Sequence, residues 1–574
     1  MKNIDVKEIP WWKKTTVYQI YPRSYMDSNG NGIGDLAGII SKLDYIKDLG
    51  VETIWFSPFY ESPTYKPYEE HDCGYDIMNY RGINAEYGDM DQCDTLIEEI
   101  HERDMKIVLD MVLNHTSMEH PWFQESRSST DNPKRDWYIW KKGKKPTPER
   151  PGGKKPPNNW QAMITGSGWH YDKATDEYYW AQFLPFQPDL NYRNPEVQEE
   201  MLNTIRFWLK KKADGFRLDI INALFEDAQF RDNPFTWQLI PSDNNEAQLF
   251  RNPINTLNHP DTIEFMKKLR STIDEFGDPS RFMVGEVSAS LHTLKRYLGE
   301  NHDGLNLVFL FQSLSTPLKK KKMQKLIELY ERYFPYPYWP TWVFGNHDRT
   351  RRASRLGGSL LKAKLNAALQ LTTRGVPFIY YGEEIGMEDG YTPLKESRDA
   401  LVNFFGWIPE FVNKLIYKIA GESLNRDYCR TPMQWNSSEN AGFSPEGART
   451  WLPVTESYKE RNVENMLAED DSILYCYRRL LKARRETPAL HAGGLRILDV
   501  NSAPKPVLVY ERSANLGNKQ QYAYAFLNFS DDEHTFLNPM KDPEFLVSTT
   551  INNEPLKEGK IRLTPWEGLV LLEK

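Results

Sequence analysis

Two kinds of segment alternate along most of this chain. Short runs rich in β-branched and aromatic residues are separated by longer segments, such as LAGIISKLDYIKDLG and MDQCDTLIEEIHERD, whose apolar residues recur every three or four positions. The short runs predict strands and the longer segments predict amphipathic helices. The eight predicted strands span 16–25, 51–59, 105–114, 215–220, 281–287, 305–311, 341–348 and 376–381.

Eight repeats of strand then helix predict an α/β fold of the (β/α)8 TIM-barrel type. Between the third and fourth strands lies an excursion of about 70 residues, whose stretch KKGKKPTPERPGGKKPPNNW is too rich in Lys, Pro and Gly for regular structure. We expect a lobe over one barrel rim. Near Gly493 the hydrophobic period changes to two, in VLVYERS, YAYAFLNF and GLVLLEK, which predicts a C-terminal antiparallel β-sandwich. The predicted domains are 1–115 with 186–490, then 116–185, and 491–574.

Composition narrows the class of protein. The chain has 574 residues. A single hydrophobic core usually stops growing at ~250–300 residues, so we expect a large domain with one or two smaller ones. No apolar run reaches the ~18 residues of a membrane span, and the start lacks a secretory signal, so we expect a cytoplasmic protein. Four cysteines (Cys73, Cys93, Cys429, Cys476) form neither a disulfide framework nor a CxxC pair. A net charge of -8 disfavours a nucleic-acid partner, because binding phosphates needs a clustered positive surface.

Chemically active side chains gather at the carboxyl ends of the predicted strands, the rim where such barrels carry their active sites. They are Asp110, Asn114, His115, Arg217, Asp219, Glu286, His347 and Asp348. A single Asp at a strand end usually caps a helix or anchors a loop. Several carboxylates at one rim, together with two His and an Arg, instead predict a catalytic site.

Glycoside cleavage uses such carboxylates, because one ionised carboxylate stabilises an oxocarbenium-like transition state while a protonated one supplies the leaving oxygen with a proton. Arg217 lies two residues before Asp219 on the same strand face, so we expect it to keep Asp219 ionised and oriented. Glu286 is then expected to be the acid, with a raised pKa. Spacing alone assigns no role to Asp348.

DMVLNH, GFRLD, GEV and GNHD, in this order and spacing, resemble the four sequence regions of the α-amylase superfamily. QPDLN resembles the fifth region of its oligo-1,6-glucosidase and α-glucosidase branch, and TVYQIYPRSY and CRTPMQW also match it. The resemblance implies that Asp219 is the nucleophile, Glu286 the acid/base and Asp348 the carboxylate that holds sugar hydroxyls. It further implies that substrate is bound by Asp72, Tyr75, His115, Arg217, His347 and Arg430. Phe183, just before QPDLN, is an additional candidate.

The branch implies an exo-acting, retaining α-glucosidase that releases glucose from isomalto- or malto-oligosaccharides or from sucrose. The residue after the nucleophile correlates with linkage in this branch, and the β-branched Ile220 favours α-1,6 cleavage. The following INALFEDAQFRDNPF instead resembles α-1,4-preferring glucosidases that act on disaccharides. The linkage therefore stays open.

The segment DSNGNGIGD places oxygen ligands at alternate positions around Gly32, like the start of a calcium loop. The predicted ligands are Asp27, Asn29, Asn31, the Ile33 carbonyl and Asp35. The branch often has Asp where Asn31 stands, which predicts weaker affinity here. We expect structural Ca²⁺ and no organic cofactor; an ion-free turn is the alternative.

Relatives with two other functions have the same barrel fold. A transglycosylating relative, such as a sucrose isomerase or trehalose synthase, would use the same covalent intermediate but keep water from it. A non-catalytic relative of the transporter-ancillary type would carry a membrane anchor and lose carboxylates, whereas this chain retains Asp219, Glu286 and Asp348.

Overall fold

The centre of the molecule is one sheet of eight parallel strands. The computed structural model describes residues 6–63, 72, 74–145, 155–163, 166–237, 250–402, 407–517, 519–551 and 554–573. The strands are β1 (Val17–Ile20), β2 (Thr53–Phe56), β5 (Lys106–Val112), β11 (Gly215–Asp219), β12 (Phe282–Gly285), β13 (Leu307–Val308), β14 (Thr341–Val343) and β15 (Val376–Tyr380). Each lies within one predicted run, and their order in the sheet, β13-β12-β11-β5-β2-β1-β15-β14, follows chain order around a barrel. The predicted (β/α)8 fold is confirmed.

Side-chain hydroxyls bridge the remaining seam between β13 and β14. Thr341 Oγ1 accepts from Leu310 N at 2.9 Å and donates to Val308 O at 3.0 Å. Ser313 Oγ accepts from Val343 N at 3.2 Å and donates to Val343 O at 2.7 Å. These bonds replace ladder bonds that backbone groups make between the other strands.

The first strand is shorter than its predicted run of 16–25. It ends at Ile20, and a 3-10 turn over Pro22–Ser24 follows. Pro22 has no backbone N–H to donate to a neighbouring strand, which explains why the apolar run outlasts the strand.

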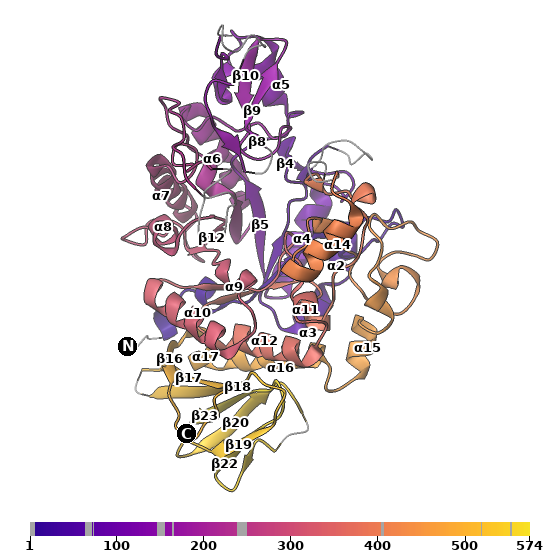
Figure 1. The fold of residues 1–574 in the computed structure, drawn as a ribbon, viewed down its shortest axis with the longest axis vertical. Helices are drawn as coiled ribbons and strands as arrows, with labels where there is room; N and C mark the ends of the chain where they lie inside the picture. Colours follow the sequence, from indigo (N-terminus) through magenta and orange to yellow (C-terminus); the bar gives the residue numbers. More distant parts are fainter. Residues whose placement is uncertain are drawn as a thin grey trace.

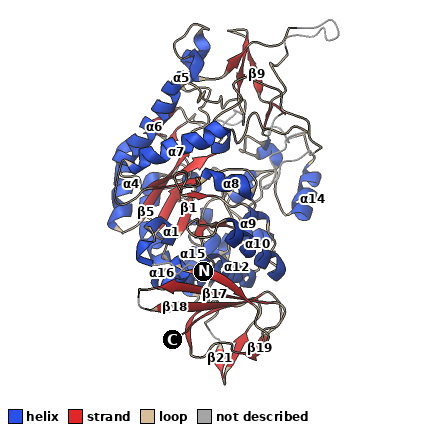
Figure 2. Cartoon of the chain, turned by 90° about the vertical axis from the view of Figure 1, so that its left-hand side faces the viewer, coloured by secondary structure: helices blue, strands red, loops and turns tan. Residues whose placement is uncertain are grey.

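Helices follow the barrel strands and surround them (Figures 1 and 2). They are α1 (Trp11–Lys14), α2 (Leu36–Ile40), α3 (Leu43–Leu49), α4 (Met90–Glu102), α6 (Pro195–Lys210), α7 (Pro260–Asp274), α8 (Leu291–Tyr297), α9 (Gln312–Ser315), α10 (Lys320–Tyr333), α11 (Arg352–Arg355), α12 (Leu360–Thr372), α14 (Glu410–Ala420), α15 (Val463–Ala468), α16 (Ile473–Glu486) and α17 (Pro488–Ala492). A short hairpin of β3 (Tyr60–Glu61) and β4 (Asn79–Ile83) precedes α4.

The predicted lobe lies between β5 and β11 and forms the top of the molecule in Figure 1. It contains α5 (Pro121–Ser128), a hairpin of β7 (Gln161–Ala162) with β8 (Gly166–Ser167), and a sheet of β6 (Trp140–Lys141), β10 (Glu177–Trp180) and β9 (Trp169–Asp172). Trp160, Trp169 and Trp180 are buried together in its own small core. The lysine-rich stretch contributes one isolated bridge, Lys144 with Lys155, and its residues 146–154 lie outside the described part.

Two antiparallel sheets form the C-terminal domain. One has the order β16 (Gly494–Leu498), β17 (Val507–Asn515), β18 (Gln520–Asn528), β23 (Gly568–Glu573), β20 (Pro543–Ser548), and the other β19 (His534–Leu537), β22 (Lys560–Leu563), β21 (Leu556–Lys557). Val507, Val509 and Phe526 pack between the sheets, whereas Leu508 and Ala525 face the barrel core. This alternation produces the period of two seen in the sequence. The predicted sandwich is confirmed, and its exact domain boundaries remain predictions.

Among the helices of the described segments, none has the length and apolar composition needed to cross a bilayer. Cys93, Cys429 and Cys476 are buried free thiols, and Cys73 lies outside the described residues. The cytoplasmic location stays a prediction from the sequence.

Candidate active site

Arg217 joins three carboxylates at the rim of the barrel. It lies on β11, and its Nη1 donates to both oxygens of Asp110 on β5, at 2.8 and 3.0 Å, and to Asp219 Oδ1 at 2.7 Å. Its Nη2 pairs with Glu286, the residue that follows β12. Because β5, β11 and β12 are neighbours in the sheet, the three acids meet around one buried guanidinium. The convergence predicted from the strand ends is confirmed.

A second cluster of charges surrounds Asp348, in the loop after β14. Asp348 Oδ1 accepts from Arg426 Nη1 at 3.0 Å and from Arg430 Nη2 at 2.9 Å. Arg426 also pairs with Asp72 at 2.7 Å and with Asp399 at 2.7 Å. Arg430 and Asp72, both expected from the resemblance to bind substrate, lie in this cluster, and the ion pair to Asp72 is made by Arg426.

His347 and Tyr75 connect the two clusters. Their rings stack with centroids 5.3 Å apart and planes 9° apart, and the Tyr75 hydroxyl lies 2.8 Å from His347 Nε2 and 3.1 Å from Asp110 Oδ2. His347 Nε2 is also 3.1 Å from Asp348 Oδ2. Gln19, on β1, lies 2.8 Å from His347 Nδ1 and fixes the other side of the ring. A continuous polar network therefore runs from Glu286 to Asp399.

His115 and Phe183 lie on the side of the inserted lobe. Their rings are parallel, with centroids 6.5 Å apart and an interplanar angle of 6°. His115 is fully buried, and its Nε2 lies 3.2 Å from the Tyr75 carbonyl oxygen. Asn114 Nδ2 lies 3.3 Å from His115 Nδ1. Phe183 is partly buried against a small apolar cluster, and this packing fixes its ring beside His115.

Ile220 holds an unusual backbone conformation directly after Asp219. Its φ of 41° and ψ of 41° are left-handed, a region that a β-branched residue rarely adopts. Such strain persists only where the surroundings impose it, and it gathers at functional sites. The strand therefore turns sharply at the carboxylate, and Ile220 remains partly exposed beside it.

Burial changes the expected protonation of Asp219. It raises the pKa of Asp219 to about 7, with Arg217 opposing the shift and Asp110 and Asp348 adding to it. The sequence led us to expect that Arg217 keeps this carboxylate ionised. Arg217 does orient Asp219, but its charge is shared with Asp110 and Glu286, so burial prevails.

The opposite holds for Asp348. Burial by itself would raise the pKa of Asp348, but contacts with His347, Arg426 and Arg430 hold that pKa well below its ordinary value. Burial lowers the pKa of His347 to about 3 and that of His115 to about 4, so both rings are neutral at pH 7. The site thus combines one permanently ionised carboxylate with one that titrates near neutrality.

The predicted calcium loop folds back on itself. Asp27 accepts backbone N–H groups from Asn29, Gly30 and Gly32, and Asn31 Oδ1 accepts from Ile33 N at 2.8 Å. Asp35 caps α2 by accepting from Gly38 N at 2.7 Å. Gly32 has a φ of 85°, and a Cβ there would lie 2.0 Å from the Arg449 carbonyl oxygen.

All candidate ligands of this loop are oxygens, which suits a hard cation, although the loop is also held by its own hydrogen bonds. The described residues contain no group of three or more His, Cys, Asp or Glu side chains that could hold a metal ion. The donor chemistry fits Ca²⁺ with two carboxylates only, Asp27 and Asp35.

Four residues of the site escaped sequence reasoning. Arg426 and Asp399 lie in the long segment after β15, away from the strand ends whose motifs indicate the other residues. Arg426 precedes the motif CRTPMQW by three residues, and this proximity was the available signal. Gln19 and Trp55 lie within β1 and β2, where apolar neighbours hid them; Trp55 Nε1 donates to Asp110 Oδ2 at 3.3 Å.

Comparisons with known proteins show what this chain is similar to. Residues 19–493 match the family model for the catalytic domain of alpha amylase. The chain is 37% identical to an oligo-1,6-glucosidase of Parageobacillus thermoglucosidasius, over 98% of both chains, and 37% identical to an alpha-glucosidase of Candida albicans, over 98% of this chain and 99% of that one. Among solved structures, the trehalulose synthase of Pseudomonas mesoacidophila MX-45 has a TM-score of 0.84 at 31% identity, covering 99% of this chain and 100% of the other.

Proposed function

Because this chain belongs to the α-amylase family of glycoside hydrolases and has glucosidases as relatives, we propose that it is an exo-acting, retaining α-glucosidase acting on short α-glucosides. The supporting observation is the pairing of Asp219 and Glu286 with the same guanidinium, that of Arg217. Retention needs two carboxyl groups ~5–5.5 Å apart, and a shared guanidinium holds two carboxylates at that scale.

In the first proposed step, an oxygen of ionised Asp219 attacks the anomeric carbon, and the bond from that carbon to the leaving oxygen breaks as Glu286 gives this oxygen its proton. In the second step, Glu286 takes a proton from water, the water oxygen bonds to the anomeric carbon, and the bond to Asp219 breaks. Arg217 orients Asp219 and Glu286 in both steps.

The charged cluster around Asp348 supports exo action. Ion pairs link Asp72 to Arg426, Arg426 to Asp348, and Asp348 to Arg430; the Asp72 and Arg430 side chains are buried, that of Arg426 is nearly buried, and that of Asp348 is partly exposed. Their oxygens and N–H groups can bind the hydroxyls of a terminal glucose, and we infer that these linked side chains close the site behind that glucose. We therefore assign them to the non-reducing end of the substrate.

Product analysis with isomaltose, maltose, sucrose and trehalose tests the proposal. Glucose should appear from at least one of them, and proton NMR should show the α-anomer first. The β-anomer as first product would exclude retention. Isomerised disaccharides without free glucose would favour the second candidate, a glucosyl-transferring enzyme, which the similarity to trehalulose synthase keeps open. The same experiment determines the preferred linkage, for which Ile220 and the segment after it give opposing indications.

The raised pKa of Asp219 leads to a pH prediction. Since the nucleophile must be ionised, kcat/KM should fall about tenfold per pH unit below the pKa of about 7. Measuring kcat/KM from pH 5 to 8 checks this.

Unfolding measured over the same range is the control. A carboxyl whose pKa is raised on folding binds its proton more tightly in the folded state, so protonation of Asp219 between pH 7 and 4 favours the fold. The fall in kcat/KM at low pH should therefore occur without a loss of stability due to Asp219. A flat kcat/KM down to pH 5 would contradict the assignment.

We also propose that the loop of Asp27, Asn29, Asn31, Ile33 and Asp35 binds structural Ca²⁺. Asn31→Asp adds a third carboxylate while its Oδ1 can still accept from Ile33 N. The variant should bind Ca²⁺ about tenfold more tightly and show a larger rise in unfolding temperature with added Ca²⁺. Titrations with Mg²⁺ are the control, and the absence of any Ca²⁺-dependent shift in both proteins would refute the site.

A further inference from the structure

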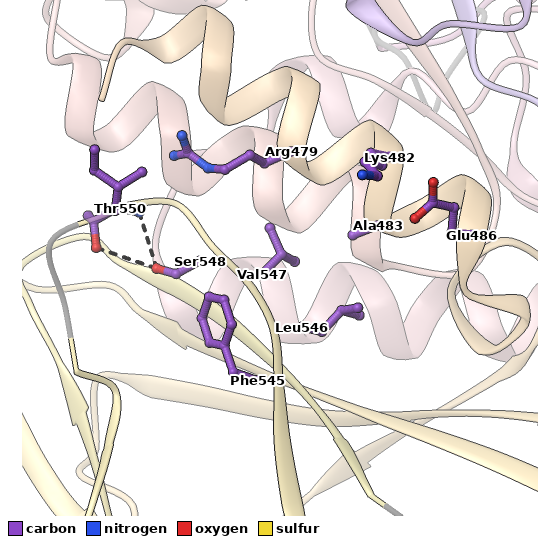
Figure 3. A pocket seen from close by; sticks show the side chains of 10 residues that line it. Arg479, Lys482, Ala483, Glu486, Phe545, Leu546, Val547, Ser548 and Thr550 are labelled. Atoms are coloured by element: carbon purple, nitrogen blue, oxygen red, sulfur yellow. Dashed lines mark hydrogen bonds between the residues drawn. The ribbon is translucent and has the colours of Figure 1, made fainter. Parts of the chain in front are cut away.

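A pocket far along the chain from the catalytic carboxylates lies between α16 of the barrel and β20 of the C-terminal domain (Figure 3). Its volume is about 420 Å³, within the range of ~300–1,000 Å³ in which small-molecule sites fall. Arg479, Lys482, Ala483 and Glu486 line it from the helix, and residues 545–548, 550 and 551 line it from the strand side.

A β-bulge shapes the strand side of the pocket. β20 is an edge strand, and its pairing with β23 shifts register between Phe545 and Val547. In a regular strand, successive side chains point to opposite faces, so Phe545, Leu546 and Val547 could not all line one pocket. The bulge lets them do so, and bulges commonly re-aim side chains at functional sites.

Phe545 forms an accessible aromatic surface in this pocket. Its side chain is 50% exposed, whereas Val547 beside it is 4% exposed and packs into the core. The firmly packed neighbour fixes the base of the pocket, while the phenyl ring stays open to a ligand. An aromatic face of this kind binds the apolar face of a flat ring.

The α16 side of the pocket supplies charged groups that make few contacts within the protein. Arg479, Lys482 and Glu486 follow one another at helical spacing on the outer face of α16, opposite its buried face. Arg479 has only long contacts, 3.4 Å to Asp470 O, 3.5 Å to Thr549 O and 3.6 Å to Asp471 Oδ1, and its buried Nε lacks a hydrogen-bond partner. Within the described residues, neither Lys482 nor Glu486 forms an ion pair.

We propose that this pocket is a second saccharide-binding site, separate from the catalytic one. An apolar ligand would make no use of the charged groups of α16, and a small anion could pair with Arg479 and Lys482 but would use neither Phe545 nor Glu486. A sugar ring satisfies both sides, because its apolar face stacks on Phe545 while its hydroxyls accept from Arg479 and Lys482 and donate to Glu486. The choice of α-glucosides as ligands rests on the proposed function.

Binding of maltotriose and isomaltotriose to the Asp219→Asn variant tests the site, because that variant should bind saccharide without consuming it. Calorimetry should show two saccharides per chain. Adding Phe545→Ala should weaken the second site about tenfold or more and leave the first unchanged. The matched control is Leu537→Ala, since Leu537 is 62% exposed on the same domain but outside the pocket.

One bound saccharide, or a second site insensitive to Phe545→Ala, would overturn the proposal. If the phenylalanine variant is unstable, Glu486→Gln tests the site independently, because it replaces the exposed ionised acceptor with a weaker neutral one and should also weaken the second site. Binding of a small anion such as benzoate, without binding of either trisaccharide, would overturn the assignment of this pocket to saccharides. Hydrolysis measured separately distinguishes failure of this site from failure of the proposed function.

Discussion

Asp219→Asn is expected to lower kcat by ~10⁴-fold or more, because an amide cannot attack the anomeric carbon to form the covalent intermediate. The fold should survive. Arg217 keeps its contacts with both oxygens of Asp110 and with Glu286, so its charge stays compensated. Since burial raises the pKa of Asp219, the carboxylate is less favourable in the folded protein than a neutral group of the same shape.

The unfolding temperature of the variant at pH 8 should therefore equal or exceed that of the parent, as is common when a buried catalytic charge is removed. Asp110→Asn is the comparison. Asp110 also contacts Arg217, but it additionally accepts from Tyr75 at 3.1 Å and Trp55 at 3.3 Å, which makes it a positioning residue. It should lose less activity than Asp219→Asn. Substantial turnover by Asp219→Asn, with the fold intact, would disprove the nucleophile assignment.

The sequence predicted those features that depend on local pattern. The eight barrel strands follow from short β-branched and aromatic runs between helical segments, the lobe from a stretch rich in Lys, Pro and Gly, and the sandwich from a period of two. The convergence of Asp110, Asp219 and Glu286 follows from the rule that strand ends meet at one rim. Parallel neighbours bring these acids together, and Arg217 connects them. No long-range information is needed for this.

Features that depend on irregular segments could not be predicted. Arg426 lies 78 positions from Asp348 and 354 from Asp72 along the chain, yet contacts both through a loop without periodic pattern. The pKa of Asp219 was misjudged because the sequence placed these acids at one rim but did not show that Asp110 and Glu286 both contact Arg217 and share its charge with Asp219. The β-bulge at β20 likewise depends on pairing with β23, a strand that begins about 20 residues later.

Arg426→Met is expected to damage both stability and activity, because Arg426 neutralises three carboxylates at once. Its guanidinium contacts Asp399 through Nε and Nη2, Asp72 through Nη2 and Asp348 through Nη1, at distances between 2.7 and 3.1 Å. Asp72 and Asp399 are almost fully buried. Breaking such a pair leaves uncompensated buried charge, which costs about 3–5 kcal/mol of unfolding free energy.

Activity should fall about 10²–10³-fold in kcat/KM, since Asp348 and Asp72 would lose the orientation with which they hold the terminal sugar. Urea unfolding and initial rates on the best disaccharide measure the two effects. Arg206→Met is the control: Arg206 also pairs with two carboxylates, Glu199 and Glu275, but both are about half exposed, so the change should stay within ~1 kcal/mol.

A double variant separates charge from shape. If the harm of Arg426→Met comes from unpaired carboxylates, adding Asp399→Asn removes one of them and should restore part of the lost stability, so that the two changes are not additive. Arg426→Lys should retain little of this stability, because a single ammonium group cannot contact three carboxylates as the guanidinium does. Full stability of Arg426→Met, or strict additivity with Asp399→Asn, would show that this cluster is not held together by Arg426.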